Sequence, residues 1–96
     1  MIKKFGQLIS QARKQKELTA RTVREKLQSE HAIDISSCYL TKIEIHDEIP
    51  SPSVTIALSR ILDIDLMLLV EAAKRREWEK FEKKLTRMYG DILMKE

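Results

Sequence analysis

The feature that most limits the possible folds is the shortage of chain-breaking residues, because the 96 residues include two glycines and two prolines. A β-sandwich or barrel needs many turns, and turns depend heavily on these two residue types. Neither type interrupts residues 66–89, which leaves room for one helix of about 25 residues, or roughly 37 Å. The sequence therefore predicts an all-α protein.

Apolar spacing and capping residues divide the chain into five expected helices. The first is defined by Phe5, Leu8, Ile9 and Ala12, which recur at helical intervals. The expected helices cover about 3–16, 20–30, 36–44, 52–62 and 66–89. Residue types that commonly cap a helix N-terminus precede the last four: Thr19, Ser36 or Ser37, Ser51 and Asp65. Residues 45–51 are expected to form a loop, and Gly90 is expected to end the last helix.

Charge is distributed unevenly along the chain. The net charge is +3, but residues 1–28 carry +6, residues 29–66 carry −5 and residues 67–96 carry +2. The basic first block favours a polyanionic partner such as nucleic acid. The alternative is an ordinary solvated helix face.

Cysteine content and hydropathy indicate the compartment. Cys38 is the single cysteine, so no disulfide forms within the chain, and a reducing environment is favoured. The N-terminus lacks the apolar run of a signal peptide, and the longest apolar stretch, Leu66 to Val70, is too short to span a bilayer. We therefore expect a cytoplasmic protein without a membrane partner.

Enzyme signatures are missing from the sequence. There is no glycine-rich phosphate loop, HExxH motif, CxxC motif or paired-carboxylate pattern. His31, His46 and Cys38 are too scattered to suggest a metal or thiol site. We expect neither catalysis nor a metal or other cofactor.

Several local patterns occur in one order along the chain: Leu18-Thr19, Val23 with Leu27, Ile35 to Glu44, Pro50 to Pro52, and Leu58 to Asp65. Together they resemble the lambda-repressor/Cro-type helix-turn-helix family. The closest piece, Tyr39-Leu40-Thr41-Lys42-Ile43-Glu44, is similar to the end of that family's recognition helix. The resemblance covers about residues 5–72. It implies a five-helix lambda-repressor-like DNA-binding domain at 1–73, and residues 74–96 would then be a C-terminal helical extension.

The third expected helix has the properties of a DNA-reading helix. An α-helix fits the major groove, and short polar side chains allow its backbone to approach the bases. Lys42 can reach a guanine acceptor or a phosphate. The resemblance assigns base reading to Ser37, Cys38 and Lys42, and backbone contacts to Thr19–Thr22. The full set of expected DNA-binding residues is Thr19, Arg21, Thr22, Ser36, Ser37, Cys38, Thr41 and Lys42. Ser36 acting only as a cap, and Cys38 as a tolerated small residue, remain alternatives.

A second pair of positions matches the family. In many members an arginine late in the first helix pairs with the glutamate that ends the third helix, and Arg13 and Glu44 occupy these positions. The resemblance implies that their side chains lie within hydrogen-bond distance. Such a pair would fix orientation more than net stability.

The chain departs from the family at three places. The connection from Leu27 to Ile35 is longer than the usual turn and contains no glycine. Ala20 replaces a frequent glutamine, and Arg24 stands where a small residue is usual, so Arg24 must face outward or find an acid. Residues 45–48, which include Asp47 and Glu48, replace a segment with glycine and basic residues. These acids would repel phosphates if they faced DNA.

An apolar stripe follows the DNA-binding pattern. Trp78, Phe81, Leu85, Met88 and Ile92 occur at alternating spacings of 3 and 4, as in the seam of a coiled coil. The stripe covers about two heptads. It can pack against a second copy of the chain, giving a homodimer, or fold back on the protomer's own body.

Two functions follow as expectations. The first is a sequence-specific, double-stranded DNA-binding transcriptional regulator of the repressor type, which reads the major groove as a dimer. The second is a helix-turn-helix-fold protein-interaction module, or an antitoxin-like regulator, whose C-terminal helix binds a partner protein.

Overall fold

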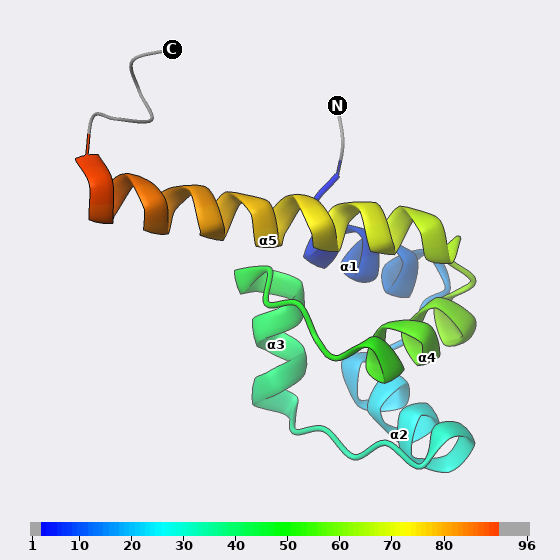
Figure 1. Ribbon diagram of the computed structural model, residues 1–96. Helices are drawn as coiled ribbons and strands as arrows, with labels where there is room; N and C mark the ends of the chain where they lie inside the picture. Colours follow the sequence, from blue (N-terminus) through cyan, green and yellow to red (C-terminus); the bar gives the residue numbers. More distant parts are fainter. Residues whose placement is uncertain (1–2, 91–96) are drawn as a thin grey trace.

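The computed structural model describes residues 3–90 (Figure 1). Every regular element within this range is a helix, which confirms the all-α prediction. The elements are α1 Phe5–Gln15, α2 Ala20–His31, α3 Ser37–His46, α4 Pro52–Leu62 and α5 Leu66–Tyr89. None of these helices combines the length and hydropathy needed to cross a membrane.

The expected N-caps are confirmed. The Thr19 hydroxyl accepts from the Thr22 backbone N–H, and the Ser36 hydroxyl accepts from the Tyr39 N–H. Ser51 and Asp65 cap α4 and α5 in the same way. Each cap satisfies a backbone donor that has no partner inside the helix, so the helix starts can be read from local sequence.

The C-terminus of α3 differs from the prediction. Ile45 and His46, expected in the loop, form the last turn of the helix. Asp47 ends the helix in the left-handed conformation, with φ 55°, and the Glu48 N–H donates to the Lys42 carbonyl. Aspartate tolerates this conformation better than most residues, so α3 extends until it reaches Asp47.

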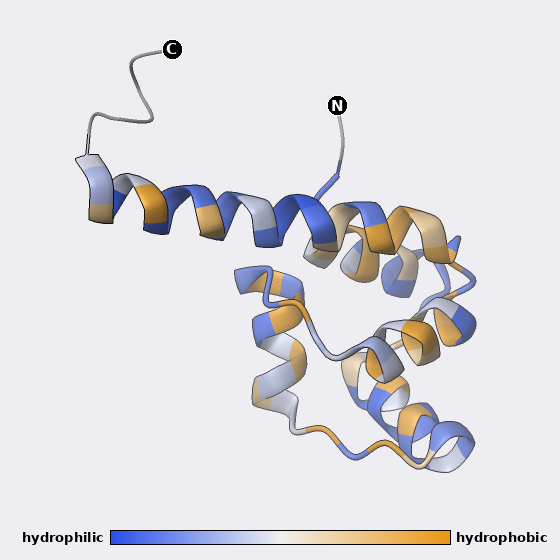
Figure 2. Cartoon of the chain, viewed as in Figure 1, coloured by the Kyte–Doolittle hydropathy of each residue, from blue (hydrophilic) through white to orange (hydrophobic). Residues whose placement is uncertain are grey.

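All five helices contribute to one core. Its largest fully buried side chains are Phe5, Ile9, Val23, Leu27, Leu40, Ile43, Leu58 and Leu69. Figure 2 shows that apolar positions gather where α1 to α4 and the first half of α5 meet. This core determines which face of α3 is buried.

The two halves of α5 have different surroundings. Leu69 and Ala72 in the first half are buried against the body. The second half of the helix projects past α3, as Figure 1 shows. Trp78 and Phe81 are 58% and 51% exposed, so the alternative in which the stripe folds back on the body is wrong for the described residues. Ile92, the last expected stripe position, lies outside them.

Candidate nucleic-acid interface

The exposed face of α3 is the central feature of the candidate site. Leu40 and Ile43 are buried on the opposite side of the helix. Five neighbouring side chains that face solvent are here called the α3 face: Ser37, Cys38, Thr41, Lys42 and Ile45. The structure thus brings four of the expected DNA-binding residues onto one continuous surface.

Ile45 is the member of the α3 face that the sequence prediction missed. Its side chain is 72% exposed and lies one turn beyond Lys42. The sequence places residue 45 in the expected loop, so the prediction does not include it. An exposed aliphatic group beside polar ones can contact a thymine methyl group in the major groove.

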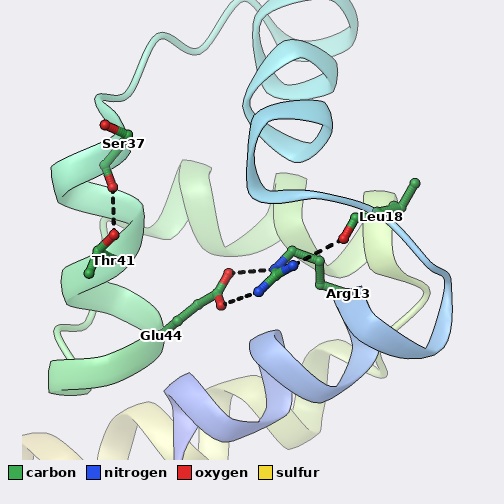
Figure 3. Close-up of polar contacts among 5 residues, drawn as sticks. All are labelled: Arg13, Leu18, Ser37, Thr41 and Glu44. Carbon is green, nitrogen blue, oxygen red and sulfur yellow. Dashed lines mark hydrogen bonds and ion pairs between the residues drawn. The ribbon is translucent and has the colours of Figure 1, made fainter.

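The hydroxyl groups of α3 are oriented by the helix itself. The Thr41 hydroxyl donates to the Ser37 carbonyl at 3.0 Å (Figure 3), which leaves its oxygen lone pairs free to accept. The Ser36 hydroxyl accepts from Tyr39 N and keeps its own proton to donate. Lys42 adds three N–H donors. The α3 face therefore offers both hydrogen-bond donors and acceptors.

The N-terminus of α2 holds the other expected contacts. The hydroxyls of Thr19 and Thr22 lie 2.9 Å apart, and Thr22 is half-buried. The Arg21 side chain is 85% exposed and approaches Glu25 loosely, at 4.0 Å. A helix N-terminus attracts anions, and Arg21 adds an exposed positive charge beside it. These groups suit phosphate contacts better than base contacts.

The expected ion pair between α1 and α3 is confirmed. Arg13 Nε donates to Glu44 Oε2 and Arg13 Nη2 donates to Glu44 Oε1, both at 2.9 Å. Arg13 Nη1 also donates to the Leu18 carbonyl at 3.0 Å, as Figure 3 shows. Leu18 immediately precedes the cap of α2, so one guanidinium joins α1, α3 and the start of α2. The third contact was not expected from sequence.

The Arg13 guanidinium stays charged through the neutral pH range. Hydrogen bonding to Glu44 raises the pKa of Arg13 above its ordinary value, although partial burial acts in the opposite direction. A cation whose pKa is raised on folding contributes fully below its ordinary pKa and loses that contribution only above the folded value. For an arginine this loss begins in strongly alkaline solution.

The long connection between α2 and α3 is held by Arg24. Its Nε donates to the Ile35 carbonyl at 3.0 Å. Arg24 is partly exposed, and a backbone carbonyl rather than an acid accepts from its Nε. Ala32 takes the left-handed conformation, with φ 54°, and ends α2. The connection is thus fixed despite its length.

The acidic segment after α3 is largely structural. Asp47 Oδ1 accepts from the Gly6 N–H at 3.0 Å, and the Asp47 carbonyl accepts from Arg76 Nε at 3.2 Å. The Asp47 side chain is only 13% exposed. Glu48 remains exposed, so it is the acid of this loop that can act on phosphates.

No protein-family model, characterised protein or solved structure matched the chain.

Proposed function

We propose that this chain is a sequence-specific, double-stranded DNA-binding regulator of transcription, of the repressor type. In this proposal α2 and α3 form a lambda-repressor-like helix-turn-helix, and α3 enters the major groove. The observation that carries it is the α3 face, which is continuous and exposed on a helix held by Arg13 and Glu44.

The dimensions of α3 support this assignment. The helix has 10 residues and is about 15 Å long. Its diameter with side chains, about 10–12 Å, matches the width of the B-DNA major groove, about 12 Å. Ser37, Cys38 and Thr41 are short enough to let the backbone approach base edges. Lys42 supplies the longest reach among the polar members of the face.

Replacing Lys42 tests base reading. Lys42→Ala is expected to weaken binding by about 2 kcal/mol, or roughly 30-fold, because a lysine contact to guanine acceptors is lost. The probe is a duplex that the wild-type protein enriches from a random pool, and fluorescence anisotropy gives Kd. Lys74→Ala removes the same charge from α5 and is expected to have little effect. Equal duplex affinities of the wild-type, Lys42→Ala and Lys74→Ala proteins would reject base reading by Lys42.

Dimerisation belongs to the same proposal. The apolar stripe exposes Trp78, Phe81 and Met88, and the rings of Trp78 and Phe81 lie 5.6 Å apart. Covering it with a second copy would remove apolar surface from water. A two-fold pair would place two α3 helices about 34 Å apart, or a multiple of that distance, on a palindromic site.

The stripe can be tested by solution mass. Trp78→Gln combined with Phe81→Gln is expected to convert a dimer to a monomer in sedimentation equilibrium at micromolar concentration, because the apolar seam loses its two aromatic side chains. Glu79→Gln with Thr86→Gln alters other faces of the same helix and is the control. A wild-type chain that sediments as a monomer would remove the homodimer from the proposal.

A partner protein is the second candidate for the C-terminal helix. An apolar groove of about 400 Å³ lies between α4 and α5, next to the stripe, and is lined by Ile49, Pro50, Ile56, Leu66 and Val70 among others. A protein-interaction module or an antitoxin-like regulator would use such a surface. This candidate is favoured if one protein binds the chain stoichiometrically and still binds when residues of the α3 face are replaced.

A further inference from the structure

The contact between Arg76 and Asp47 shows which side of α5 faces the end of α3. Arg76 Nε donates to the carbonyl of Asp47, the residue that caps the C-terminus of α3, and lies 3.7 Å from Asp47 Oδ2. The Arg76 side chain therefore points from α5 toward the end of α3. Any residue in helical register with Arg76 points to the same side of α5.

Three residues that follow Arg76 in helical register are cations, and Glu79, at an interval of 3, lies beside them. Lys80, Lys83 and Arg87 follow at intervals of 4, 7 and 11, which place them on the same helical row. We call Arg76, Lys80, Lys83 and Arg87 the basic row. It extends about 16 Å along the helix at 1.5 Å per residue. Lys80 approaches Glu77 at 3.9 Å across exposed surface, a contact that contributes little.

The basic row and the α3 face border the same space. The rest of the helical body lies on one side of α3, and the second half of α5 extends past α3 on the other side (Figure 1). Leu40 and Ile43 point into the core, so the α3 face on the opposite side of the helix is turned away from the body, on the side past which α5 projects. The two helices thus form a corner, with the α3 face on one arm and the basic row on the other.

From this corner we infer that Lys80, Lys83 and Arg87 contact the phosphate backbone of the duplex that α3 reads, an inference that rests on the proposed function. A DNA strand presents one negative charge about every 3.4 Å along the axis, and the row presents a cation about every 5 Å. The apolar stripe lies on the far side of α5, about 120–200° around the helix from Arg76. One face of α5 would therefore contact DNA, and the opposite face would contact a protein surface.

The test compares two triple variants of the full chain with equal charge loss. K80Q/K83Q/R87Q removes three cations of the row, and R60Q/K74Q/R75Q removes three exposed cations that lie outside the row, one on α4 and two on other faces of α5. Glutamine maintains helix propensity. Kd is measured from 50 to 300 mM salt on the duplex enriched by the wild-type protein. The row variant is expected to make the negative slope of log K against log salt shallower by about 2.7 and to weaken binding about tenfold or more. The control variant is expected to change the slope by less than about 1.

The outcomes separate this inference from the proposed function. If Lys42→Ala weakens binding while the two triple variants bind alike, the basic row does not contact DNA and the proposed function stands. If the wild-type chain enriches no duplex, both fail. If the row variant keeps the wild-type slope but no longer binds phosphatidylserine vesicles, the row serves a membrane surface and the inference is overturned.

Discussion

Gly6→Ala is expected to destabilise the protein by about 4 kcal/mol, since the added methyl group has no space. A Cβ at this position would lie 2.4 Å from the Ile43 carbonyl oxygen and 2.6 Å from that of Glu44. Both are backbone atoms of α3, so relief requires α1 and α3 to separate. Overpacking costs about 1–3 kcal/mol, and loss of the Gly6–Asp47 hydrogen bond adds a similar amount. The roughly 1 kcal/mol that alanine gains in helix propensity cannot offset this.

Urea unfolding of the Gly6 variant provides the measurement. A loss of this size in a domain of about 100 residues corresponds to a fall in Tm of roughly 15–30 °C. Lys14→Ala, on the exposed side of the same helix, is expected to stay within about 0.5 kcal/mol of wild type. A Gly6 variant as stable as Lys14→Ala would show that α1 and α3 are not closely packed at this point.

The helices and their caps could be predicted because the information is local. Thr19, Ser36, Ser51 and Asp65 each bond to a backbone N–H two or three residues later. Such contacts depend on residue type and on a few neighbouring positions. They locate the start of a helix even when nothing is known of its packing.

Contacts between distant segments were mostly beyond prediction from the residues themselves. Asp47 joins Gly6 and Arg76, which lie 41 and 29 residues away. In the sequence, Asp47 is one acid in an exposed-looking loop, and nothing local shows that it contacts these two residues. The pair of Arg13 and Glu44 was anticipated, but through resemblance to a family rather than through spacing or composition.

The candidate site combines both kinds of information. The polar residues at the start of α3 could be predicted, because Ser36 fixes the helix start and helical periodicity then separates the inner and outer faces. Ile45 was missed because the end of α3 depends on the left-handed conformation of Asp47. The direction of the basic row was not predictable either, since it follows from the contact between Arg76 and Asp47.

The ion pair between Arg13 and Glu44 combines a structural role with a proposed functional one. Their side chains are 17% and 9% exposed, so neither charge is well solvated. A bidentate pair has a directional geometry, and here it joins α3 to α1 while Leu18 links it to the start of α2. It therefore controls how the α3 face is presented relative to the N-terminus of α2.

Glu44→Ala is expected to destabilise the protein by about 3 kcal/mol, because it leaves the partly buried guanidinium of Arg13 without its anionic partner. Arg13→Met combined with Glu44→Leu removes both charges and fills the space with apolar side chains, so stability is expected to recover to within about 1 kcal/mol of wild type. Duplex affinity should nevertheless remain about tenfold or more below wild type, because the directional contact that orients α3 is still absent. Urea unfolding and anisotropy on the same samples measure the two effects separately. If the double variant recovers both stability and affinity, the pair contributes charge compensation and not orientation.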